Sequence, residues 1–303
     1  PPAPAARERL RESFGAQADR WLLIISVMAP TVMMMLSSTI VNVSVPVMSG
    51  ELGATNDTIS WVLTSYMVAM SVVLPLTGYL NDRLGRRGYL LLSIAGFVVA
   101  SALCSMATSL VQMVLCRILQ GVSGAAFVPL SRTIVADAYP RDQAARAMAV
   151  WGLGVVGAPI FGPTLGGYLT ETFDWRWIFY INLPLGIVAA ALVWSYVRDS
   201  IHQERAERVD WLGIALLTVA VGSVQWMLER GERYDWFESP FVTSLGIISV
   251  VSFVGLVWHE LRTDEPVINF HVLRNRQLAT GVVMGALLGF ALFGSVFVLP
   301  VFL

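Results

Sequence analysis

An arginine lies deep inside one of the apolar stretches of this sequence. Arg117 occurs in the segment CRILQGVSGAAF, and at the rise of an α-helix it lies roughly 12 Å from the nearer end of that stretch. A charge at the centre of a membrane helix costs about 2.5 to 3.5 kcal/mol on insertion scales, so it persists where it faces a cavity or a partner. Gln120 lies near the same helix face. We predict that Arg117 and Gln120 form a polar site within a membrane; an arginine that extends to the surface is the alternative.

Acidic residues are missing from the middle of the apolar stretches. The chain has 21 Asp and Glu residues, and all of them fall in tails, in loops or at the ends of predicted spans. A proton-driven transporter needs a titratable group in its cavity. The first apolar stretch instead carries Ser37, at a depth similar to that of Arg117, and Asn42. We predict that both line a cavity with Arg117, although such groups often serve only as hydrogen bonds between helices.

A second group of polar residues fills the short gap between two apolar runs, in the segment GYLNDRLGRRGY. It contains one acid, three arginines and two glycines that favour a tight reversal: Asp82, Arg83, Arg86, Arg87, Gly78 and Gly85. Clustered arginines are typical of cytoplasmic loops, so on charge alone this is an ordinary positive-inside loop.

The elements that must position these residues are membrane helices. The chain has 303 residues, of which 56% are hydrophobic and 14% are charged. Apolar runs of membrane-spanning length occupy residues 22–48, 58–81, 89–107, 109–136, 144–170, 177–197, 209–228, 240–260 and 278–303. The fold class predicted is therefore an all-α, multi-pass membrane protein with about nine transmembrane helices. A net charge of −1 indicates no nucleic-acid partner, and the His and Cys spacing indicates neither a metal site nor a disulfide.

Arginine counts predict the orientation. With a cytoplasmic N-terminus, fifteen arginines lie in inner segments and only three, Arg176, Arg230 and Arg233, lie in outer loops.

Small residues and prolines are concentrated in the fifth span. The set consists of Gly157, Pro159, Gly162, Pro163, Gly166 and Gly167. Prolines bend a helix and glycines leave a smooth face, so the span could slide against a neighbour or simply pack closely.

These motifs resemble those of one family. The pattern G-x-L-x-D-R-x-G-R-R resembles the loop between helices 2 and 3 of major facilitator superfamily transporters, and R-x-x-Q-G is similar to their motif tied to proton coupling. The fifth span resembles the motif that separates antiporters from symporters. The stretches LSSTIVNVSVP and WRWIFYINLPLG resemble the 14-helix drug:proton antiporter family of the EmrB/QacA type. That family usually has an aspartate where this chain has Ser37, so the acid that the resemblance would supply as proton carrier is missing from this stretch.

The resemblance covers nearly the whole chain and implies a major facilitator fold, with about five further helices after Leu303. Its implied parts are a cytoplasmic N-terminal segment at 1–21, an N-terminal six-helix bundle at 22–197, a cytoplasmic linker at 198–208, two extra linker helices at 209–260, and at 261–303 an inner segment with the start of a truncated C-terminal bundle. The charged loop would latch the inner gate, and the fifth-span glycines would form a sliding seam.

The implied function is multidrug efflux of amphipathic or cationic compounds in exchange for protons, by alternating access in a bacterial inner membrane. The implied partners are small-molecule substrates, protons and the lipid bilayer; some family members also use a periplasmic adaptor protein. No cofactor and no enzyme activity are implied. A narrow-substrate exporter of a lipid, siderophore or metabolite, and a non-transporting membrane sensor or scaffold, are the alternatives. An intramembrane enzyme would need a nucleophile and base at membrane depth, which the sequence does not supply.

Overall fold

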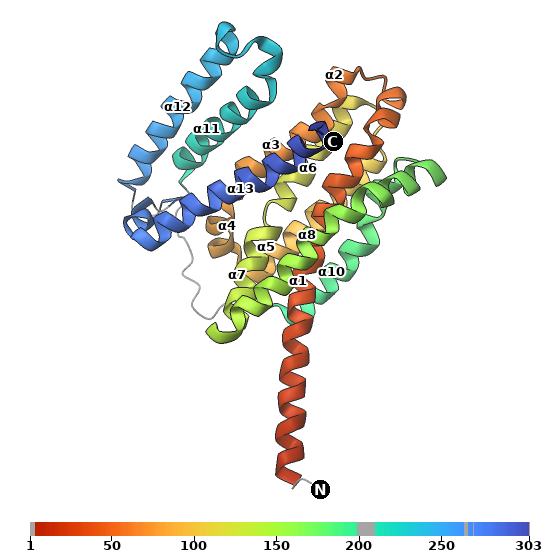
Figure 1. The fold of residues 1–303 in the computed structure, drawn as a ribbon, viewed down its shortest axis with the longest axis vertical. Coiled ribbons are helices and arrows are strands. Elements are labelled where there is room, and N and C mark those ends of the chain that lie inside the picture. Colours follow the sequence, from red (N-terminus) through yellow and green to blue (C-terminus); the bar gives the residue numbers. More distant parts are fainter. Residues whose placement is uncertain (1–3, 199–209, 264–265, 269, 303) are drawn as a thin grey trace.

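The computed structural model describes residues 4–198, 210–263, 266–268 and 270–302. Within these ranges every regular element is a helix, which confirms the all-α prediction (Figure 1). The elements are α1 (Pro4–Glu51), α2 (Asn56–Ile59), α3 (Trp61–Val73), η1 (Leu74–Leu76), α4 (Thr77–Leu84), α5 (Arg86–Ser105), α6 (Leu110–Gly124), α7 (Phe127–Ala138), α8 (Arg141–Thr172), α9 (Trp177–Tyr180), α10 (Asn182–Tyr196), α11 (Trp211–Arg230), η2 (Glu232–Tyr234), η3 (Trp236–Glu238), α12 (Pro240–Glu260), η4 (Phe270–Arg274) and α13 (Arg276–Phe302).

Among the described residues, eight spans are long and apolar enough to cross a membrane. They are Arg20–Glu51, Trp61–Leu84, Arg86–Ser105, Leu110–Ala138, Asp142–Thr172, Trp177–Tyr196, Trp211–Leu228 and Pro240–Glu260. These agree with the first eight predicted spans to within three residues at every end. The ninth predicted span falls on α13. The predicted N-terminal segment is helical from Pro4, and Figure 1 shows this part of α1 extending beyond the bundle.

Two spans are interrupted along their length. The second consists of α3, the 3₁₀ turn η1 and α4, and Pro75 within η1 has no amide hydrogen to donate to a continuous helix. The fourth is divided into α6 and α7 at Ala125 and Ala126. Both breaks are short, and the backbone on either side of each stays in the right-handed helical region.

Helix α1 packs against α7, α8 and α10, while α5 and α3 both pack against α6. Helix α10 also packs against α5. Buried apolar clusters support both ends of this bundle; one contains the rings of Phe97 and Phe127, 5.5 Å apart, and the other contains Trp175. The packing gathers α1, α3, α5, α6 and α10 around one point, where the polar side chains described below meet.

The helices predicted as an extra pair, α11 and α12, pack against each other and lie beside the main bundle (Figure 1). Helix α11 also packs against α3. Buried Leu217 and Leu256 join Leu76 in a separate apolar cluster, and Trp61 and Trp226 meet edge to face with ring centroids 5.7 Å apart. The pair is therefore attached to the bundle through the second span. The domain boundaries themselves stay predictions, and most of the predicted linker at 198–208 lies outside the described residues.

Candidate functional site

A buried polar network surrounds Arg117, whose side chain is 1% exposed. Its Nε donates to the backbone carbonyl of Val62 at 2.9 Å, and its Nη1 donates to Oε1 of Gln120 at 2.6 Å. The guanidinium carbon lies 4.2 Å from the centroid of the Tyr66 ring. A desolvated cation–π contact of this kind contributes about 2 kcal/mol. The charge is thus balanced by a carbonyl dipole, an amide oxygen and an aromatic face.

Three more side chains extend the network to other helices. Nε2 of Gln120 donates to Oγ of Ser101 at 2.7 Å and lies 3.4 Å from Oγ of Ser37. Nδ2 of Asn182 reaches the same two hydroxyls, at 3.3 Å for Ser101 and 3.4 Å for Ser37. We call Arg117, Gln120, Ser37, Ser101 and Asn182 the Arg117 network. It joins α1, α5, α6 and α10 to the backbone of α3.

A glycine on α6 positions the network. A Cβ on Gly121 would collide with the backbone carbonyl oxygen of Tyr66 and would lie 3.0 Å from Cβ of Ala69. The missing side chain lets α6 approach α3 closely. Arg117 lies about one helical turn earlier on α6, and the close approach brings its guanidinium within reach of the Val62 carbonyl.

Among the described residues, no carboxylate pairs with the Arg117 network. Its other members are neutral amides and hydroxyls, and an arginine remains protonated in proteins. The network therefore holds a fixed positive charge inside the bundle. It has no group that releases a proton in the physiological range.

The structure brings three of the four predicted cavity residues together, but it does not place them on an open cavity. Arg117, Gln120 and Ser37 are buried between helices, with exposed fractions of 1%, 0% and 1%. Asn42 is exposed on α1 and is absent from the network. Asn42 is five positions after Ser37, so the two side chains point about 140° apart around the helix axis.

Sequence reasoning missed Ser101 and Asn182. Both are almost fully buried, at 0% and 1% exposed. A single serine or asparagine within an apolar span is a weak signal, because such residues also serve as ordinary contacts between helices.

The charged loop forms the turn between α4 and α5. Gly85 adopts φ +83°, a conformation that favours glycine, and it is the N-cap residue of α5. Arg86 pairs with Asp137 at 2.5 Å, and the guanidinium of Arg87 lies 4.0 Å from the Trp194 ring centroid. Gly78, Asp82 and Arg83 lie on α4, where Nη1 of Arg83 donates to the Tyr79 hydroxyl at 3.2 Å. Arg86 and Arg87 thus connect α5 to the ends of α7 and α10.

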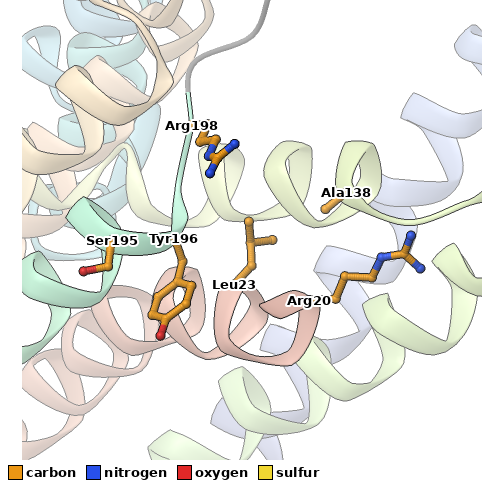
Figure 2. Close-up of a pocket in the computed structure, with 6 residues that line it drawn as sticks. All are labelled: Arg20, Leu23, Ala138, Ser195, Tyr196 and Arg198. Atoms are coloured by element: carbon orange, nitrogen blue, oxygen red, sulfur yellow. The ribbon is translucent and has the colours of Figure 1, made fainter. Parts of the chain in front are cut away.

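A cavity of about 350 Å³ lies at the same end of the bundle (Figure 2). Arg20 and Leu23 of α1 face it together with Tyr196 of α10 and Arg198 from the segment that follows. The guanidinium of Arg20 lies 5.9 Å from the ring centroid of Tyr139, and burial raises the pKa of that tyrosine. Two arginines of the predicted inner segments therefore border this cavity.

The small residues of the fifth span divide into two groups on α8. A Cβ on Gly162 would collide with the Thr39 side chain, and one on Gly166 would lie 3.0 Å from the carbonyl oxygen of Ile40. These two glycines therefore set the close packing of α8 on α1. Gly157 and Gly167 face open space instead. Pro159 and Pro163 lie inside the continuous helix.

Among the described residues, no three His, Cys, Asp or Glu side chains are arranged to hold a metal ion. Cys104 and Cys116 are free thiols on neighbouring helices. The chemistry that the site offers is consequently that of a fixed cation in a hydrogen-bonded network.

Together, the membrane-length helices, the buried arginine network and the glycine-containing charged turn define a multi-pass helical membrane protein. The family model of the Major Facilitator Superfamily matches residues 27–303, and the chain belongs to this superfamily.

Curated relatives include exporters. The chain is 34% identical over 279 residues to the multidrug export protein EmrB of Escherichia coli, covering 92% of this chain and 54% of that protein. It is 38% identical over 275 residues to the fatty acid resistance protein FarB of Neisseria gonorrhoeae, covering 89% and 54%. The chain spans about half the length of these relatives.

Solved structures show the same fold. The proton:xylose symporter XylE matches with a TM-score of 0.55 and 15% identity, covering 72% of this chain and 55% of that one. The human organic anion transporter MFSD10 matches with a TM-score of 0.51 and 15% identity, covering 78% and 71%.

Proposed function

We propose that this protein, made from its complete reading frame, exports amphipathic or cationic compounds from the cytoplasm in exchange for protons. The observation that carries the proposal is the Arg117 network: a buried cation that pairs with no carboxylate among the described residues and links α1, α5, α6 and α10, on a scaffold whose relatives are named multidrug export proteins. A buried charge is retained in a membrane protein chiefly where it serves a substrate or ion pathway.

The proposed setting is a bacterial inner membrane with the N-terminus in the cytoplasm. Positive-inside counting supports this orientation. It is also supported by contacts that group the basic helix ends: Arg86 reaches the end of α7, Arg87 reaches the end of α10, and Arg20 faces Tyr139. In this orientation the α4–α5 turn lies at the inner gate.

In the proposed mechanism, the two halves of the complete transporter rock around a midplane cavity, and the Arg117 network responds to charge within it. A carboxylate that loses its proton near the network gains attraction to the fixed cation, and one that is protonated loses it. The network itself does not titrate, so the proposal assigns the transported proton to an acid outside it.

The test measures ethidium accumulation in an efflux-deficient bacterium that expresses the complete reading frame. The measurement is repeated on the same cells after an ionophore has collapsed the pH gradient. We expect expression to lower accumulation and collapse of the gradient to restore it. Unchanged accumulation, despite protein in the membrane, would contradict multidrug export.

A narrow-substrate exporter is the second candidate. The relative named for fatty acid resistance favours it, because that name points to one class of substrate on the same scaffold. A panel of dyes, detergents and fatty acids separates the two: resistance to a single class supports the narrow exporter, and resistance to several supports multidrug efflux. Resistance to none, with the protein inserted, supports the sensor or scaffold.

A further inference from the structure

A cavity of about 350 Å³ lies at the ends of three elements, apart from the Arg117 network (Figure 2). Arg20 and Leu23 border it from α1, Ala138 borders it from the end of α7, and Tyr196 and Arg198 border it from the end of α10 and the residues that follow. Ligand sites in proteins measure about 300 to 1,000 Å³, so this cavity has room for a small ligand or for one part of a larger one. The proposed export mechanism does not use it.

The two charged residues that line the cavity are both arginines. Arg20 and Arg198 come from different elements, and Figure 2 shows their side chains on opposite sides of Leu23. Among the residues that the structure describes, neither arginine forms an ion pair. Asp137, near the end of α7, pairs with Arg86 instead. Both guanidiniums therefore keep donors for an anionic ligand.

The cavity lies at the boundary of the membrane-length spans. Arg20 begins the first of these spans, Ala138 ends the fourth and Tyr196 ends the sixth. These ends fall at the depth where the hydrocarbon core of a bilayer meets the polar head groups. A soluble anion and a lipid head group can both reach this depth, so other features must separate them.

The surroundings of the cavity favour a lipid. Trp21 and Trp194 each neighbour a lining residue in sequence, and they are 39% and 65% exposed. Tryptophan is enriched at the level of the head groups. Leu23 and Ala138 add apolar surface to the lining, which suits the glycerol and first methylene groups of a lipid better than a fully hydrated anion.

Phosphate is the anionic group that phospholipids present at this depth. Arginine binds phosphate through two parallel N–H donors. Basic recesses between membrane helices on the cytoplasmic side bind anionic head groups. A zwitterionic head group also has a phosphate, but it brings a cation of its own, which the arginines repel. The lining therefore selects an anionic lipid over a zwitterionic one.

We propose that this cavity binds the phosphate group of an anionic phospholipid, held between Arg20 and Arg198. Soluble phosphate esters share the recognised group, and the experiment below separates the two sources. The proposal goes beyond the export function and does not rest on it; the proposed orientation enters only in assigning the lipid to the inner leaflet. A lipid that binds the folded protein stabilises it by mass action, so occupancy should raise the unfolding temperature.

The test measures the unfolding temperature of the purified complete protein in a nonionic detergent during titration with a short-chain phosphatidylglycerol. Two other compounds are titrated in parallel. Phosphatidylcholine of the same chain length has the acyl chains but no net charge, and glycerol phosphate has the phosphate but no acyl chains. We expect phosphatidylglycerol to raise the unfolding temperature saturably, and the other two to require concentrations about fivefold higher or more.

Three variants and a matched control locate the binding. Arg20→Gln and Arg198→Gln each remove one partner of the phosphate, and Ala138→Glu places a carboxylate at the cavity. Each should raise the Kd for phosphatidylglycerol about fivefold, the effect of one arginine near a membrane surface. Arg146→Gln, at an exposed arginine of α8 outside the lining, changes the net charge by the same amount and should leave the Kd unchanged. The unfolding temperature without lipid verifies that each variant is folded.

Three results would overturn the proposal. The first is the absence of a saturable shift with phosphatidylglycerol. The second is an equal shift with phosphatidylcholine, which would assign the effect to the acyl chains. The third is equal weakening by all four substitutions, which would mean that the lipid responds to net charge and not to a cavity.

Glycerol phosphate that binds as tightly as phosphatidylglycerol would identify a soluble phosphate ester as the occupant, and the assignment to a lipid would be wrong. Ethidium export by the same variants tests the proposed function separately, because none of the substitutions changes a residue of the Arg117 network.

Discussion

No carboxylate among the residues that the structure describes neutralises the guanidinium of Arg117, and its hydrogen-bond donors explain how it is held inside the bundle. Two hydrogen bonds diverge from one planar group, to the Val62 carbonyl and to Gln120, while its face covers the Tyr66 ring. An ammonium group cannot reproduce this geometry, because it is a compact point charge without a planar face. The residue is thus specified as arginine and not simply as a cation.

Arg117→Ala and Arg117→Lys should each lower the rate of coupled efflux at least tenfold while the protein still inserts in the membrane. The first removes the charge and the second breaks the forked hydrogen bonding, at a cost of about 1.5 kcal/mol or more. Efflux is measured together with the amount of protein in the membrane. Arg132→Lys, at an exposed arginine of the same span, serves as the control. Efflux at the wild-type rate in either Arg117 variant would remove this residue from the mechanism.

Sequence could predict part of this site for a physical reason. A charge within an apolar span is costly, so Arg117 and its neighbour Gln120 are conspicuous without any structure. Ser101 and Asn182 are uncharged, so their burial costs less than that of a charge, and their role depends on how α5 and α10 are rotated toward α6. Helix rotation is set by packing, which a single sequence does not record. The exclusion of Asn42 was available in advance, because its angle from Ser37 follows from helical geometry.

At the level of elements, hydrophobic length predicted the spans to within three residues, yet it gave no information on which helices touch. Close approach is decided by individual glycines, and only some of them matter. Gly121 faces the backbone of α3, whereas Gly152 on α8 faces open space. A glycine-rich sequence alone does not distinguish these two situations.

Gly121→Val should separate α6 from α3 and lower the stability of the protein. The added atoms meet a backbone carbonyl that cannot rotate away. Overpacking in protein cores typically lowers stability by about 1 to 3 kcal/mol, and we expect this substitution to cost at least that much. Thermal unfolding of the purified protein in detergent measures it. Gly152→Val adds the same atoms to open space and should leave the unfolding temperature within error. Equal effects of the two substitutions would contradict the packing argument.

The ion pair of Arg86 with Asp137 connects the start of α5 to the end of α7. Its contribution to the free energy of unfolding should be small. The two side chains are 19% and 54% exposed, and exposed pairs contribute about 0 to 1 kcal/mol. Asp137→Asn should therefore change the unfolding temperature little. A large decrease would show that the α4–α5 turn depends on this pair, and a loss of efflux at unchanged stability would assign the pair to gating.

Across the part of the molecule that the structure describes, several helices expose apolar faces, and the most exposed of these side chains include a row on α8. Leu153, Val156 and Ile160 are 75%, 71% and 72% exposed, and Gly157 lies among them with open space before it. The relatives are about twice as long as this chain, so their remaining length provides a candidate partner for this face. The bilayer is the alternative, since membrane helices also expose apolar side chains to lipid.

Two glycine substitutions on α8 distinguish these alternatives. Gly162→Val collides with Thr39 of α1, inside the bundle itself. Such overpacking lowers stability by about 1 to 3 kcal/mol, so the unfolding temperature of the complete protein should decrease by several degrees. A Cβ on Gly157 would meet no atom within 4 Å, so we expect Gly157→Trp to leave the bundle stable while efflux falls at least tenfold, since the bulky ring obstructs a moving contact. If Gly157→Trp exports ethidium at the wild-type rate, the face lies against lipid. The fifth span then acts in packing alone.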